Sequence, residues 1–143
     1  MTGDRCLAFV YAAGREKIRE FAHAVGETDP RFFDVAAARD AGFADVVAPL
    51  MFVAVYAGPA FREALWSPAL GVDRSLTVHG AQEFAWAAPV VAGDELTTRT
   101  ALVDDAAAGR HRRLVLRTTS VNQRGETAAV GTWTVLERGA ART

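Results

Sequence analysis

The stretch VVAPLMFVAVYAGPAFREALW, from Val46 to Trp66, is the most apolar part of this 143-residue chain. Apolar residues recur in it at the spacing of a helix that is buried on most sides. Pro49 stands near its start, where a missing N–H does no harm. Gly58-Pro59 is expected to kink this helix or to divide it into two pieces. A helix of this kind needs other elements around it.

The second half of the chain supplies a sheet that can surround this helix. Four stretches there are rich in β-branched and aromatic residues, and short turn-forming segments separate them. Consecutive strands are therefore expected to pair as antiparallel hairpins. A buried helix followed by such strands is an α+β layout with the sheet curled about the helix, which is called the hot-dog fold. The predicted strands are Ser75–Ala87, Glu95–Asp105, Arg113–Asn122 and Thr127–Glu137, with Ala106–Gly109 as one of the turns.

The first third of the chain is expected to hold a short strand and two helices. Leu7–Tyr11 is a short apolar stretch that predicts a strand or an extended arm. Arg15–Val25 has apolar residues on one face and charged residues on the other, and Gly26 is a plausible end for this helix. Asp34 is expected to cap a second helix over Val35–Ala41.

Length and composition predict one soluble domain over residues 1–138, with residues 139–143 as a flexible tail. The chain is 50% hydrophobic and carries a net charge of −1, which excludes a disordered protein and provides no overall basic field for nucleic acid. No apolar run reaches the roughly 18 residues of a membrane span. The N-terminus lacks the pattern of a signal peptide, so we expect a cytoplasmic protein.

Metal and cofactor chemistry is not indicated by the sequence. Cys6 is the only cysteine, so an internal disulfide is excluded and a cysteine-based zinc site is not expected. The three histidines lack the spacing of metal ligands, and no glycine-rich phosphate loop stands out. We therefore predict no metal and no cofactor.

An acidic turn lies beside apolar sequence in the first half of the chain. Glu27, Asp29 and Asp34 lie close to Phe32 and Phe33. A carboxyl shielded there could serve as a general acid or base if burial raised its pKa. The alternative is turn chemistry, in which Asp29 accepts hydrogen bonds from neighbouring amides.

A second polar position is His79, in the stretch Val78–Phe84. Gly80 interrupts an otherwise good strand there and permits a β-bulge or the close approach of a ligand. His79 is either a structural histidine or part of a site, and the residues alone leave both interpretations open.

Arg110-His111-Arg112-Arg113 is a local basic cluster in a chain of nearly balanced charge. It is either a solvated loop or strand start, or an electropositive landing site for a phosphate or an acidic carrier protein.

Several motifs follow one another from about Tyr11 to Leu136. They are Tyr11–Ala22, Gly26-Glu27-Thr28-Asp29-Pro30, Ala36–Phe43, Ala48-Pro49-Leu50-Met51-Phe52, His79-Gly80-Ala81-Gln82-Glu83-Phe84, Pro89-Val90 with Gly93-Asp94-Glu95-Leu96, and Asn122–Glu126. Together they resemble the MaoC-like dehydratases, and most of all the branch shared with the dehydratase region of type I fatty acid synthases.

The resemblance implies a hot-dog domain that acts on 3-hydroxyacyl thioesters of acyl carrier protein or coenzyme A. Members reversibly dehydrate (3R)-hydroxyacyl groups to trans-2-enoyl products, using an Asp and a His in the motif Ser-Gly-Asp-x-Asn-Pro-x-His. This chain reads Val-Gly-Glu-Thr-Asp-Pro-Arg-Phe at that place. Glu27 therefore stands at the catalytic Asp, Asp29 at the Asn and Phe32 at the catalytic His. A phenyl ring cannot exchange a proton.

The loss of this histidine leaves two interpretations open. In the first, the chain shapes the acyl tunnel of a heterodimeric dehydratase while a second hot-dog subunit supplies the Asp and His. In the second, a homodimer uses a substitute acid or base, for which Glu27, Asp29 and His79 are the candidates. Under either interpretation we expect the protein to act in fatty-acid or polyketide metabolism. A module that binds the thioester or its carrier without any chemistry is a variant of the first.

Further residues follow from the expected substrate. If a carrier protein delivers it, Arg110, Arg112 and Arg113 are the residues expected to contact that carrier. The free edges of a single sheet make a dimer, rather than a monomer, the expected state. The predicted tunnel residues are Phe32, Phe33, Leu50, Met51, Phe52, Gly80 and Gln82.

Overall fold

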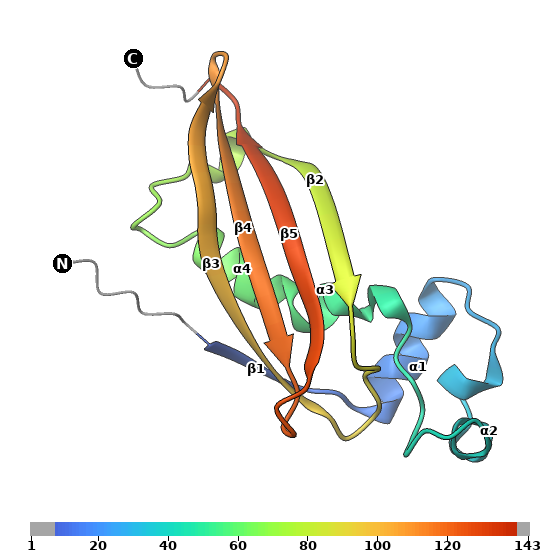
Figure 1. Ribbon diagram of the computed structural model, residues 1–143. Coiled ribbons are helices and arrows are strands. Elements are labelled where there is room, and N and C mark those ends of the chain that lie inside the picture. Colours follow the sequence, from blue (N-terminus) through green and yellow to red (C-terminus); the bar gives the residue numbers. More distant parts are fainter. Residues whose placement is uncertain (1–7, 140–143) are drawn as a thin grey trace.

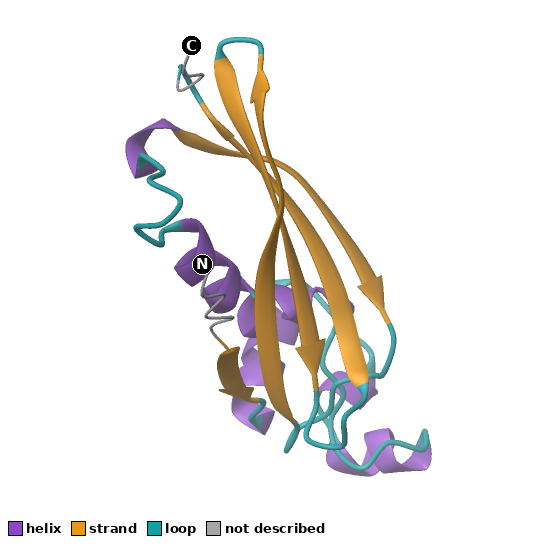
Figure 2. Cartoon of the chain, turned by 60° about the vertical axis from the view of Figure 1, so that its left-hand side comes forward, coloured by secondary structure: helices purple, strands orange, loops and turns teal. Residues whose placement is uncertain are grey.

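The computed structural model describes residues 8–139, which form an antiparallel sheet of five strands with the central helices along one face (Figures 1 and 2). The strand order is β1-β3-β4-β5-β2, so β1 and β2 are the edges of the sheet. This arrangement confirms the predicted α+β class. The strands are β1 (Ala8–Ala12), β2 (Thr77–Trp86), β3 (Glu95–Ala108), β4 (His111–Val121) and β5 (Thr127–Glu137); the α-helices are α1 (Arg15–Ala24), α2 (Val35–Asp40), α3 (Val53–Tyr56) and α4 (Gly58–Leu65); the 3-10 helices are η1 (Pro30–Phe32), η2 (Leu50–Phe52) and η3 (Arg74–Leu76).

The central apolar stretch is helical over a shorter length than predicted. Its first residues are extended, and Val47 forms an isolated bridge with Val91, so a helix from the start of this stretch is wrong. The helical turns begin at Leu50, because Pro49 disfavours helical angles in the residue before it. The expected division at Gly58-Pro59 is confirmed, since α3 ends just before these residues and α4 begins with them.

The sheet pairings are antiparallel as predicted, but the hairpin of β3 and β4 is longer than expected. The predicted turn at Ala106–Gly109 is wrong, because β3 continues as far as Ala108 and pairs there with His111. Gly109 and Arg110 form the turn, with Gly109 at a φ of +62°. Cross-strand pairing thus overrides the weak strand preference of the alanines. The tip of this hairpin projects past the helices (Figure 2).

The hydrophobic core lies between the helices and the inner face of the sheet. Phe52 of η2 is completely buried at its centre. Its ring lies 6.0 Å from Tyr11 of β1, 5.5 Å from Phe21 of α1 and 6.2 Å from Tyr56 of α3, measured between ring centroids. The N-terminal elements β1 and α1 therefore meet η2 and α3, about 30 residues further along the chain, on one aromatic side chain.

Gly131 of β5 makes room for the indole of Trp133. A Cβ atom at residue 131 would lie 2.7 Å from the Phe84 ring and from Thr118 Oγ1. Without it, Trp133 Nε1 donates a hydrogen bond to Thr118 Oγ1 at 2.9 Å. The indole also stacks on Phe61 of α4, with ring centroids 4.4 Å apart and planes at 11°. This stack joins the sheet to the helix layer.

The predicted ends of the two N-terminal helices agree with the structure to within one residue. α1 is followed by Gly26, which has a φ of +78°, a conformation that glycine adopts without steric cost. Asp34 caps α2 as predicted, since its carboxylate accepts a hydrogen bond from the Ala36 N–H at 3.0 Å. Over residues 8–139 no helix is long and apolar enough to cross a bilayer.

Parts of the predicted terminal segments lie outside the described residues. These parts are Cys6, Leu7 at the start of the predicted first strand, and residues 140–143 of the predicted tail. Gly139 is described, and its N–H donates to His111 Nδ1 at 3.2 Å.

Gly131→Ala should lower the free energy of unfolding by about 1–3 kcal/mol, because the added methyl group overpacks the space beside Trp133. Chemical denaturation followed by circular dichroism measures the change. Gly80→Ala is the matched control, since a Cβ there meets Thr134 O at 3.4 Å and should cost much less. Equal losses in the two variants would show that crowding at Gly131 is not the cause.

Candidate functional site

A groove of about 440 Å³ lies between helix α4 and the strands β2 and β5. This volume is within the range of sites that hold small organic ligands. The stacked rings of Phe61 and Trp133 form an aromatic wall, and His79 and Gln82 of β2 are also among the lining residues. Two of the residues predicted from the sequence are therefore brought together here.

His79 faces the aromatic wall of this groove. The centroid of its ring lies 6.4 Å from Phe61 and 6.1 Å from Trp133. The pairing of β2 with β5 shifts register between His79 and Ala81, which confirms the bulge expected at Gly80. In the described part of the chain, no hydrogen bond engages the imidazole, so its ring nitrogens are available to a ligand.

Asp29 has the turn role that the sequence analysis left open. Its carboxylate accepts a hydrogen bond from the Arg31 guanidinium at 2.6 Å and another from the Arg31 N–H at 2.9 Å, at the start of η1. These hydrogen bonds hold the pKa of the Asp29 carboxyl below its ordinary value. A carboxylate that stays ionised in this way is poorly suited to act as a general acid near neutral pH.

Glu27 lies at the end of α1 and is half-buried. Its N–H donates to Ala22 O at 2.9 Å and so helps to close the helix. Within residues 8–139 its carboxylate has no hydrogen-bond partner. Neither Glu27 nor Asp29 lines the groove that contains His79. The three predicted acid or base candidates are therefore not brought together in one chain.

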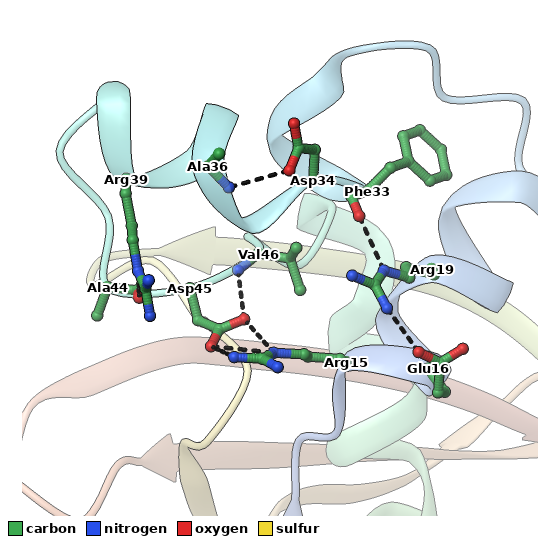
Figure 3. Close-up of polar contacts among 10 residues, drawn as sticks. All are labelled: Arg15, Glu16, Arg19, Phe33, Asp34, Ala36, Arg39, Ala44, Asp45 and Val46. Atoms are coloured by element: carbon green, nitrogen blue, oxygen red, sulfur yellow. Dashed lines mark hydrogen bonds and ion pairs between the residues drawn. The ribbon is translucent and has the colours of Figure 1, made fainter.

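Two arginines of α1 bind the segments that follow this helix (Figure 3). Arg19 Nε donates to Phe33 O at 2.8 Å. Arg15 forms a bidentate ion pair with Asp45, in which Arg15 Nη2 lies 2.7 Å from Asp45 Oδ2. Asp45 Oδ1 also accepts a hydrogen bond from the N–H of Val46 at 2.8 Å. The hydrogen bond from Arg15 holds the pKa of Asp45 below its ordinary value. The turn and the start of the central apolar stretch are thus tied to the same helix.

The aromatic and apolar residues predicted to line a tunnel do not share one surface. Phe52 is completely buried, whereas its neighbours Leu50 and Met51 are 64% and 47% exposed. Phe32 and Phe33 are half-buried at η1. Phe52 presents no surface to a ligand in this chain, and we describe it as a core residue.

The two predicted tunnel residues on β2 differ in their surroundings. Gly80 lies in the bulge of this exposed strand, and Gln82 lines the groove. Gln82 is the member of the predicted tunnel set that the groove contains.

A second, smaller cavity of about 100 Å³ lies beside η2. Leu50 borders it, and Leu50 O accepts a hydrogen bond from Trp86 Nε1 at 2.8 Å. Tyr56 also lines this cavity, and burial raises the pKa of its phenol above the ordinary value. The phenol therefore stays protonated at neutral pH and can donate a hydrogen bond. No motif in the sequence distinguishes Tyr56 from its apolar neighbours.

Most of the predicted basic cluster is paired with carboxylates. Arg112 lies 2.8 Å from Asp105 and 3.3 Å from Glu137, and Arg113 lies 2.6 Å from Asp104. Arg110 is exposed in the hairpin turn. The cluster presents less free positive charge than its sequence suggests, and its contact with a carrier protein stays a prediction.

Several residues that line the groove could not be recognised as functional candidates from the sequence. Phe61 and Leu65 of α4 stand four residues apart, which predicts a shared buried face rather than a binding surface. Trp133 reaches the groove only because Gly131 leaves space and because β5 pairs with β2. No local pattern reveals either condition.

Comparisons with known proteins identify the family. Residues 1–130 match the family described as FAS1-like, dehydratase domain region. A UPF0336 protein of Parafrankia sp. (strain EAN1pec) is 44% identical over 131 residues, which cover 92% of this chain and 87% of that protein. The chain therefore belongs to the family of FAS1-like dehydratase domains.

Two solved structures are similar to this chain. The first is a C-terminally truncated HadBC (3R-hydroxyacyl-ACP dehydratase) complex from Mycobacterium tuberculosis, with 31% identity, a TM-score of 0.77, and coverage of 94% of this chain and 98% of that chain. The second is a MaoC-like dehydratase with 32% identity and a TM-score of 0.81, and the match covers 92% of this chain and 40% of that chain. Both matches confirm the hot-dog fold and the resemblance to MaoC-like dehydratases.

Asp45→Asn should destabilise the chain at neutral pH, because the variant loses the charged partner of Arg15. The pKa of Asp45 is lower in the folded chain than in the unfolded chain. This stabilisation is therefore present above the ordinary carboxyl pKa and is lost as the pH falls through the lower, folded value.

Thermal unfolding of wild type and Asp45→Asn over a series of pH values measures this effect. The difference between the two melting temperatures should be clear at neutral pH and vanish in strong acid. A difference that does not change with pH would contradict an ionic role for Asp45.

Proposed function

We propose that this chain is the substrate-binding subunit of a (3R)-hydroxyacyl-thioester dehydratase, paired with a second hot-dog subunit that carries the catalytic Asp and His. The observation that carries this proposal is Phe32, which stands where the family motif has its catalytic histidine. Asp29, in the same motif, is engaged with Arg31. The chain retains the fold of the family without the usual pair of proton-transferring groups. We place the reaction in cytoplasmic fatty-acid or polyketide metabolism.

The groove supports a role in binding the acyl chain. Its aromatic wall and apolar lining favour a hydrocarbon chain, because burying apolar surface from both partners is favourable. Gln82 and His79 add polar atoms that can meet a thioester or hydroxyl oxygen.

Strand β2 is the surface that we propose for pairing with the second subunit. It is an edge strand, most of its residues are exposed, and its outer edge presents unpaired backbone groups that can accept another strand. Val78 and Trp86 are large apolar residues that are 44% and 40% exposed on it. The similarity to the HadBC complex supports pairing with a second hot-dog subunit.

His79 supports a second candidate function, a self-sufficient homodimer. Of the three acid or base candidates predicted from the sequence, it is the one that lines the groove. Imidazole groups in general can exchange protons near neutral pH. The contribution of His79 to turnover therefore has to be tested directly.

The test is the hydration of a trans-2-enoyl thioester, followed by the loss of conjugated-enoyl absorbance. The purified chain alone should give no turnover above background, and addition of a MaoC-like hot-dog chain with the intact Asp and His motif should give turnover. Glu27→Gln and Asp29→Asn should leave the kcat of the pair little changed, and His79→Ala should affect the KM for the thioester without abolishing turnover. Turnover by the chain alone that His79→Ala abolishes would instead establish the homodimer.

Gln82→Trp should raise the KM for long-chain enoyl thioesters roughly tenfold in the active pair and spare short-chain ones, because the larger side chain fills part of the groove. Steady-state kinetics with a series of chain lengths measures the change. Glu83→Trp is the matched control, since successive residues of a strand point to opposite faces. An equal effect of both substitutions would show that the groove does not hold the acyl chain.

A further inference from the structure

A shallow depression of about 570 Å³ adjoins the groove at the C-terminal end of α4. Arg62 and Trp66 line both the groove and the depression, so the groove and the depression share a wall. Arg74 of η3 lines the depression as well. The segment between α4 and β2 lies on the helix side of the sheet before η3 returns the chain to β2 (Figure 2). Two arginines from different elements therefore meet next to the groove.

The guanidinium groups of these arginines are not paired with carboxylates in the part of the chain that the structure describes. The guanidinium carbon of Arg74 lies 5.1 Å from the centre of the Trp66 ring. This cation–π contact orients the group without neutralising its charge. The carboxylate that lines the depression is that of Glu63, so two positive charges face one negative charge.

Arg62 is directed back along α4 toward the groove. Its Nη1 would lie 3.1 Å from a Cβ atom at Gly58, and Gly58 itself lines the groove. The absence of a side chain at Gly58 therefore leaves the space that this guanidinium occupies. The positive charge of Arg62 lies at the junction of the apolar groove and the positively charged depression.

We infer that Arg62 and Arg74 bind a phosphate group of the thioester carrier while the acyl chain lies in the groove. This inference rests on the proposed function, since it concerns the other end of the same substrate. A planar guanidinium matches the geometry of phosphate oxygens with paired hydrogen bonds. The phosphopantetheine arm of coenzyme A and of acyl carrier protein carries such a phosphate. The paired arginines of the β3–β4 hairpin lack this combination of free charge and contact with the groove.

The test compares ligands that share an acyl chain and differ in phosphate. Octanoyl-coenzyme A, octanoyl-acyl carrier protein and octanoyl-N-acetylcysteamine are titrated into the chain, alone and with the second subunit, by calorimetry. The N-acetylcysteamine thioester has no phosphate, and none of the three ligands can be dehydrated.

Arg62→Ala and Arg74→Ala should each weaken binding of the phosphate-bearing ligands roughly tenfold or more, which is the loss expected for a hydrogen bond to a charged group. Arg74→Ala, at a residue outside the groove lining, should leave the affinity for the N-acetylcysteamine thioester unchanged, and any loss that Arg62→Ala causes for this thioester should be smaller than its loss for the phosphate-bearing ligands. Arg117→Ala, at an exposed arginine of β4, is the matched control and should change neither. A loss with both carriers assigns the phosphate to the shared arm, and a loss with coenzyme A alone assigns it to the nucleotide.

Unchanged affinity for every phosphate-bearing ligand, or an equal loss for the phosphate-free thioester, would overturn the inference. Failure of the proposed function is seen separately, as no binding of the N-acetylcysteamine thioester by the wild-type protein. If octanoyl-coenzyme A still bound in a way that depends on Arg62 and Arg74, the phosphate site would be supported even though the proposed acyl-binding function had failed. Added salt should weaken binding of the coenzyme A ligand and not of the phosphate-free one.

Discussion

The stack of Trp133 on Phe61 is the contact on which the rest of this structure depends. It joins the inner face of the sheet to α4, and it is possible because Gly131 has no side chain where the indole needs space. The same two rings form the aromatic wall of the groove. A groove whose wall is made from a packing contact is held by the core itself, so its shape does not depend on a mobile loop.

The acidic turn keeps part of the family motif, with Phe32 at the position of the histidine. Asp29 binds Arg31 and caps η1, and the loop around it is tied to α1 through Arg19. The residues of this motif now stabilise a turn, with Phe32 in place of a proton-transferring group. The groove that contains His79 is a separate feature of the fold, and neither Glu27 nor Asp29 lines it.

The arginines of this chain differ in whether they are paired with carboxylates. At the tip of the long hairpin, Arg112 and Arg113 are bound to carboxylates on neighbouring strands. Next to the groove, Arg62 and Arg74 form no ion pair among the described residues, and Glu63 is a carboxylate that lines the same depression. The number of arginines in a short stretch of sequence is therefore a poor guide to the free positive charge of the folded surface.

Much of the fold could be predicted from the sequence, because the signals are local. Strand alternation and short turns predict the hairpins, and Asp34 predicts the cap of α2 from its own position. The candidate site could be predicted only in part, as His79 and Gln82. The depth of Phe52 in the core and the stacking of Trp133 depend on contacts between residues far apart in the chain. The sequence by itself determined the class of fold and the loss of the motif histidine, whereas the tertiary structure alone decided which side chains share a groove and which charges stay free, because both follow from long-range packing.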